Sequence, residues 1–134
     1  MKKLLLLLLF TILIFSCGSS DDSDNDYSNT SIVGSWQLTS ILENGIPAHE
    51  KCDLESIMTM LETNKGNFTQ YYSEDDTSDS CDESATIDLT WSLASSSTYN
   101  LTFLGVGESV SAVLDGETLT IDGDDDEVIV FTRN

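Results

Sequence analysis

The stretch Gly34-Ser35-Trp36 opens the first clear β-strand that the sequence predicts, over residues 32–42. A large aromatic residue stands two places after a glycine, and apolar residues then alternate with polar ones, as in a half-buried strand. Arg133 lies at the exit of the last predicted strand. If the strands close into a barrel, these two strands are neighbours, and the Arg133 guanidinium can stack on the Trp36 indole. We therefore predict that Gly34, Trp36 and Arg133 close one end of a barrel.

Seven further strands are predicted along the chain. Segments rich in Thr, Val, Ile and aromatic residues alternate with turn-forming residues, and no long helical periodicity is present. The Asp115-Gly116 pair is a strong signal for a tight hairpin. Such a meander removes its exposed edges by closing, so we predict an all-β fold, a small eight-stranded antiparallel up-and-down barrel. The further strands are predicted over residues 54–61, 67–72, 85–93, 98–104, 109–114, 118–121 and 127–132, with longer loops at 46–53 and 73–83.

The interior of an eight-stranded barrel holds either packed side chains or one small ligand. The strand at 85–93 has the cleanest alternation, and Ala85, Leu89 and Leu93 are among the residues that face one way. Aromatic residues in the inward phase of the strands are the candidates for lining a ligand cavity. They are Phe68, Tyr72, Trp91, Tyr99 and Phe103.

Residues 1–16 have the features of a bacterial signal peptide. Lys2 and Lys3 precede an apolar run over residues 4–15, which is too short to span a bilayer stably. The run leads to Ser16-Cys17, and residues 13–17 resemble a lipobox. The resemblance implies cleavage before Cys17, thioether lipidation of that cysteine and acylation of the new amino terminus. An ordinary signal peptide followed by an incidental cysteine is the alternative.

Residues 17–30 are polar and acidic and cannot bury a core, so we predict a disordered tether before a folded domain at 31–134. Gly18, not aspartate, follows the predicted lipidated cysteine, which by resemblance to lipoprotein sorting implies the outer membrane. The acidic run at 19–26 also resembles the tether of surface-exported lipoproteins in Bacteroidota. We predict a cell-envelope, outer-membrane lipoprotein, with the periplasmic face and the outer face both open.

The charge of the chain excludes two classes of partner. All 24 acidic residues lie after Cys17, but only three of the five basic residues do, so the formal charge of that part is −21. Nucleic acid and anionic lipid surfaces repel such a chain. Several acyl chains, at about 0.8 kcal/mol per buried CH₂ group, anchor a protein despite this repulsion. We therefore predict that the membrane is contacted through the lipid on Cys17.

Once Cys17 is assigned to a lipid, an even pair of cysteines remains, Cys52 and Cys81. In an oxidising compartment, such a pair favours a disulfide. Metal ligation by the pair would need two more soft ligands, and His49 is the only histidine in the chain. We predict a Cys52–Cys81 disulfide, and neither a metal nor another cofactor.

The stretch at 32–40 is similar to the opening of the lipocalin-like domains of small Bacteroidota lipoproteins. Gly34-x-Trp36 is similar to the glycine-x-tryptophan signature of lipocalins in general. In that wider family an arginine near the end of the last strand stacks on this tryptophan, and Arg133 stands at that place. The cysteine before the second strand, the turn at 66–69 and the strand at 90–93 also fit. The resemblance implies a lipocalin-like barrel over nearly the whole folded domain.

Catalysis is not predicted. His49 is alone in a predicted loop, and the sequence has neither a Gly-x-Ser-x-Gly elbow nor a free thiol. The run Asp122-x-Asp124-x-Asp126 could attract calcium. However, Glu127 and Arg133 stand at the sixth and twelfth places, where an EF-hand loop needs glycine and glutamate.

Two functions therefore remain open. The first is an envelope-anchored lipoprotein whose barrel binds a small hydrophobic ligand. The second is a non-enzymatic structural or interaction lipoprotein with a packed barrel, whose acidic loops meet a protein or glycan partner. An open apolar interior of several hundred Å³ would favour the first, and a filled core would favour the second.

Overall fold

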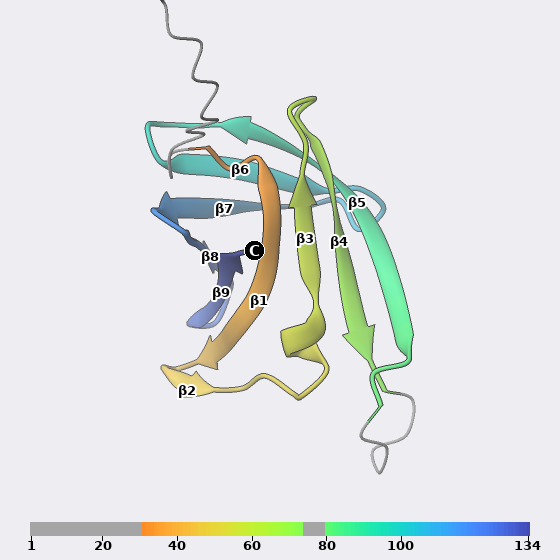
Figure 1. Cartoon of the computed structure of the whole chain (residues 1–134). Helices are drawn as coiled ribbons and strands as arrows, with labels where there is room; N and C mark the ends of the chain where they lie inside the picture. Colours follow the sequence, from red (N-terminus) through yellow and green to blue (C-terminus); the bar gives the residue numbers. More distant parts are fainter. Residues whose placement is uncertain (1–30, 74–79) are drawn as a thin grey trace, which may run out of the picture.

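The computed structural model describes residues 31–73 and 80–134 (Figure 1). The predicted signal peptide at 1–16, the predicted tether at 17–30 with the predicted lipidation site Cys17, and part of the predicted loop at 73–83 lie outside the described residues. Within the described ranges, no helix is both long and apolar enough to cross a membrane.

The described residues form one antiparallel sheet that closes on itself. Eight strands form a ring in the order β1-β3-β4-β5-β6-β7-β8-β9, and β9 pairs back with β1. The predicted eight-stranded antiparallel barrel is therefore confirmed, and the two-residue strand β2 is an addition at the edge of β1. The strands are β1 Gly34–Glu43, β2 Ile46–Pro47, β3 Ile57–Met60, β4 Lys65–Tyr72, β5 Glu83–Leu93, β6 Thr98–Phe103, β7 Glu108–Asp115, β8 Thr118–Asp122 and β9 Glu127–Arg133.

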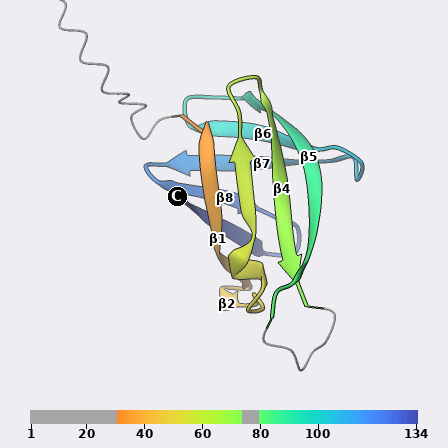
Figure 2. The same cartoon turned by 45° about the vertical axis from the view of Figure 1, so that its right-hand side comes forward.

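Two views show how the ring is shaped. β1, β3 and β4 run side by side on one wall of the barrel, and β6 and β7 cross behind them at a steep angle (Figures 1 and 2). We call the end at which β1 begins and β9 ends the closed end. The opposite end, which carries β2 and the 3-10 turn η1 (Asp53–Glu55), is the open end.

The second strand is shorter than predicted. The pattern predicts a strand over 54–61, but β3 begins at Ile57 and is preceded by η1. The turn satisfies its own backbone, because the Ser56 amide donates to the Asp53 carbonyl oxygen at 2.9 Å and the Asp53 carboxylate accepts from the Glu50 amide at 2.7 Å. Because this segment is apolar on both faces, its sequence pattern does not distinguish the 3-10 turn from the strand that follows it.

The predicted loop at 46–53 also contains a short strand. Asn44 and Gly45 both have positive φ, 53° and 77°, which suits a tight hairpin turn and folds β2 back onto β1. Beyond β2, the Ala48 amide donates to the Ile41 carbonyl oxygen at 2.8 Å. These contacts occupy the stretch of β1 that has moved away from β3.

The core fills the half of the barrel next to the closed end. Strand β5 shows the limit of this core, because Leu89 is buried whereas Ala85 and Leu93, in the same phase, are exposed. Both ends of β5 extend past the packed layer. The buried hydrophobic residues of this core are Ile32, Trp36, Leu38, Met58, Met60, Leu89, Tyr99, Leu101, Ala112, Leu114, Leu119, Ile121 and Phe131.

Trp36 and Arg133 join the first and last strands at the closed end. The two residues are paired in the β1–β9 register, and Cζ of Arg133 lies 4.3 Å from the centroid of the indole. Trp36 is 0% exposed, and its Nε1 donates to the Ile32 carbonyl oxygen at 2.8 Å. The guanidinium also donates to the carbonyl oxygens of Val33, at 2.9 Å, and Ser31. A cation–π contact and several hydrogen bonds therefore fasten this end of the ring.

Cys52 and Cys81 form the predicted disulfide, with a Cα–Cα distance of 5.4 Å. Cys52 directly precedes η1, and Cys81 lies two residues before β5 begins. The bond therefore ties the η1 segment to the β5 wall at the open end of the barrel.

Candidate functional site

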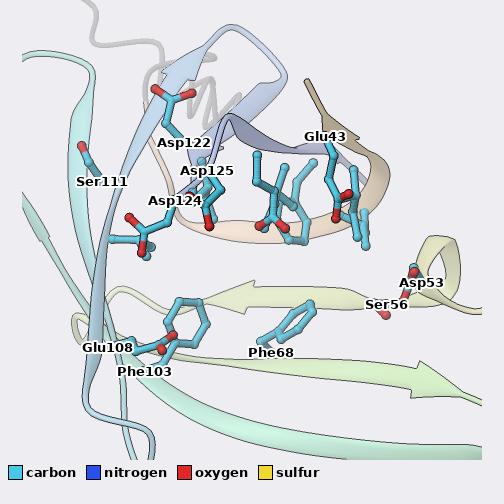
Figure 3. Close-up of a pocket in the computed structure, with 18 of the residues that line it drawn as sticks. Glu43, Asp53, Ser56, Phe68, Phe103, Glu108, Ser111, Asp122, Asp124 and Asp125 are labelled. Carbon is cyan, nitrogen blue, oxygen red and sulfur yellow. The ribbon is translucent and has the colours of Figure 1, made fainter. Parts of the chain in front are cut away.

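The open end of the barrel contains a cavity of about 960 Å³. Its lining comes from β1, β4, β6, β7, β8 and β9, so it lies inside the ring rather than on its outer face (Figure 3). The cavity exists because the packed core stops part of the way along the barrel. Its lining divides into an apolar floor and an acidic rim.

The apolar floor is built around three phenylalanines. Phe68 packs edge-to-face against Phe103, with ring centroids 6.5 Å apart, and against Phe131, with centroids 6.0 Å apart. Phe131 is buried, whereas Phe68 and Phe103 are only partly buried and so present ring surface to the cavity. The other apolar residues of the floor are Leu38, Ile41, Val110, Ile121 and Ile129.

Ser56 is a buried polar residue in the cavity wall. Its Oγ accepts a hydrogen bond from the Tyr71 amide at 3.1 Å, and its carbonyl oxygen accepts from the Leu38 amide at 2.9 Å. Ser56 therefore ties η1 to both β1 and β4, at the place where β1 and β3 separate. We assign it a structural role in shaping the mouth of the cavity.

Carboxylates form the rim. Among the described residues, seven acidic residues line the cavity, and no lysine, arginine or histidine does. In Figure 3 the labelled carboxylates lie on different sides of the opening, above and beside the phenylalanine rings. The acidic residues of the rim are Glu43, Asp53, Glu108, Asp122, Asp124, Asp125 and Glu127.

The β8–β9 turn, which carries Asp124 and Asp125, is held by hydrogen bonds of its backbone. The Gly123 amide donates to the Glu127 carbonyl oxygen at 2.9 Å, and the Glu127 amide donates to the Asp124 carbonyl oxygen at 3.1 Å. The Asn44 amide donates to the Asp126 carbonyl oxygen at 3.2 Å, which joins this turn to the β1–β2 turn. The carboxylates are therefore positioned by two turns that support each other.

The structure brings together only two of the five aromatic residues predicted to line a cavity. Phe68 and Phe103 line it, but Trp91, Tyr99 and Tyr72 do not. Trp91 and Tyr99 pack edge-to-face with centroids 5.9 Å apart, and Tyr99 is in the packed core. Tyr72, at the last position of β4, is 40% exposed. The phase of a strand predicts which face a residue is on, but not its height in the barrel.

The described ranges bear on two expectations from the sequence, those for metal binding and for His49. No group of three or more His, Cys, Asp or Glu side chains among these residues is arranged to hold a metal ion. The imidazole of His49 lies beside β1, where its Nδ1 accepts from the Ile41 amide at 3.5 Å.

A closed antiparallel ring of eight strands with one packed end and one open end is the architecture of lipocalin-type barrels. Residues 32–132 match the model of the lipocalin-like domain, which is more than half of the chain. The chain therefore belongs to the lipocalin-like domain family, as the Gly34-x-Trp36 signature predicts. No curated protein and no solved structure matches the chain.

Proposed function

We propose that this lipocalin-like barrel binds a small hydrophobic ligand at its open end. The observation that carries the proposal is the cavity of about 960 Å³ with a floor of phenylalanine and aliphatic side chains. The volume lies within the range of roughly 300–1,000 Å³ that is typical of small-molecule sites, and the apolar floor can take the body of such a ligand, while the rest of the lining is polar. The alternative of a packed barrel without a ligand fits the closed end, but it leaves the apolar floor at the other end unexplained.

The proposal includes the cellular location predicted from the sequence, the outer membrane. In it, Cys17 carries the lipid and holds the domain at the outer membrane, and the Cys52–Cys81 disulfide fits an oxidising compartment. Labelling of cells with an alkyne analogue of palmitate tests the anchor. Wild-type protein should be labelled and should fractionate with the outer membrane, whereas C17S should be unlabelled. Equal labelling of the two would overturn the lipidation of Cys17.

Ligand binding is tested with N-phenyl-1-naphthylamine, a neutral apolar dye that fluoresces when it leaves water. The folded domain should enhance its fluorescence saturably. Two matched substitutions on β7 locate the site: V110W places an indole in the cavity, and V113W places one on an exposed outer position. V110W should abolish the saturable signal, and V113W should retain it.

Circular dichroism establishes that both variants fold before they are compared. Absence of saturable binding to the wild type, together with no ligand in native mass spectra of protein purified from its own envelope, would overturn ligand carriage. Equal binding by V110W and V113W would place the dye outside the barrel.

A further inference from the structure

We infer that the ligand of this cavity is a cationic amphiphile, an apolar body with an amine or other positively charged group at one end. This inference rests on the proposed function and adds the chemical class of the ligand. Its basis is the division of one cavity into an uncharged floor and a polar rim whose charged side chains, among the described residues, are all carboxylates.

The carboxylates converge on the mouth from separate parts of the chain. Glu43 ends β1, Asp53 begins η1, Glu108 begins β7 and Asp122 ends β8, while Asp124 and Asp125 lie in the β8–β9 turn. These segments are far apart in sequence, and the ring of strands brings them to the same opening (Figure 3). The acidic rim is therefore a product of the fold rather than of one acidic run.

Of the three basic residues in the described ranges, two lie at the closed end, and the third, Lys51, lies at the open end but outside the cavity lining. The described residues include one arginine and two lysines. Lys65, the first residue of β4, and Arg133, the last residue of β9, lie at the closed end. A ligand with a carboxylate or phosphate head would thus meet like charges at the mouth, with no cation in the lining to offset them.

A cationic head group gains from the same arrangement. The rim carboxylates attract a cation, and walls of low dielectric constant focus their field into the opening. The apolar floor below takes the hydrocarbon body, which loses contact with water. The geometry therefore orients the ligand, with its apolar body against Phe68 and Phe103 and its charged end among the rim carboxylates.

The experiment compares three competitors that share one chain length: decylamine, decanol and decanoate, each below its micellar concentration. Each displaces N-phenyl-1-naphthylamine from the wild-type domain. Decylamine should bind at least about tenfold more tightly than decanol, and decanoate should bind most weakly. Raising the salt concentration from about 20 mM to 300 mM should reduce the preference for decylamine, because ions screen charges at an exposed rim.

Two triple variants separate the rim from the overall negative charge. D122N/D124N/D125N neutralises rim residues, and asparagine tolerates the positive φ of 56° at Asp125. D88N/D115N/E117Q removes the same charge from exposed positions outside the cavity lining. The rim variant should lose most of the preference for decylamine with its decanol affinity unchanged, and the control should keep the preference.

The outcomes distinguish the inference from the proposed function. Equal affinities for decylamine and decanol in the wild type would overturn the cationic ligand and leave apolar binding intact. Equal losses of preference in the two triple variants would overturn the assignment to the rim. Failure of every probe to bind would overturn the proposed function itself.

Discussion

Nη1 of Arg133 occupies the space beside Gly34 in which any other residue would carry a side chain. A Cβ atom at Gly34 would lie 2.7 Å from this nitrogen, which is closer than such atoms approach in proteins. Gly34 also has a φ of 143°, a value that residues with a side chain rarely adopt. Two features therefore favour glycine at this position of the Gly-x-Trp signature: the backbone φ, and the guanidinium of an arginine 99 positions later in the chain.

Substitution of this glycine tests that relationship. G34A should reduce the free energy of unfolding by about 1–3 kcal/mol, because it combines backbone strain with a clash. G45A is the matched control, since Gly45 also has positive φ, 77°, but nothing within 4 Å of its Cβ position. Urea denaturation followed by circular dichroism measures both.

A double-mutant cycle isolates the contact. In an R133A background the clash is absent, so G34A should cost less than it does in the wild type. Equal costs in the two backgrounds would mean that Arg133 does not restrict position 34.

Removal of the indole should be the most damaging of the changes considered. W36A should reduce the free energy of unfolding by about 3–5 kcal/mol, because Trp36 is fully buried in the closed end. L93A, at a position that is 59% exposed, should change it by less than about 0.5 kcal/mol. Similar denaturation midpoints for the two variants would place Trp36 outside the core.

The disulfide should contribute to stability through the loop that it closes. Cys52 and Cys81 are separated by 29 positions, for which the chain-entropy model gives roughly 3–4 kcal/mol. C52A/C81A should therefore unfold at a lower urea concentration, and wild-type protein under reducing conditions should unfold near the same concentration. An unchanged midpoint after reduction would show that the bond adds no stability.

The Ser56 hydroxyl should contribute measurably to the free energy of unfolding. S56A leaves the Tyr71 amide without its hydrogen-bond acceptor and should cost about 1–2 kcal/mol. S111A, at an exposed position in the same cavity lining, should cost less than about 0.5 kcal/mol. If S56A were equally mild, water from the cavity would be replacing the hydroxyl.

The barrel was predictable from the sequence because its signals are local. Alternation identifies the strands, Asp115-Gly116 identifies a hairpin, and Gly34 and Trp36 identify the family. The prediction over 54–61 is wrong in its first residues because backbone hydrogen bonds around Asp53 form a turn there. Propensity alone does not reveal such contacts.

The site was less predictable because it depends on register. Phe103 and Tyr99 lie in the same phase of β6, yet Phe103 lines the cavity and Tyr99 is in the core. The position of each residue along the barrel axis follows from the register of β6 with β5 and β7. The sequence of β6 alone does not reveal this register. The acidic rim was not predicted from the sequence for a related reason. Glu43, Asp53 and Glu108 line the same cavity as the β8–β9 turn only when the ring of strands closes.

The contacts at the closed end also determine where the chain enters the barrel relative to the cavity. Ser31, the first described residue, is hydrogen-bonded to Arg133, so the chain enters the domain at the end opposite the cavity. In both views β1 begins at the upper end of the barrel, and the open end, which carries β2, is at the bottom (Figures 1 and 2). If Cys17 holds the chain to a membrane as proposed, the predicted tether at 17–30 joins the barrel at its closed end. The point of attachment and the opening are then at different ends of the barrel, so a ligand can enter the cavity without displacing the tether.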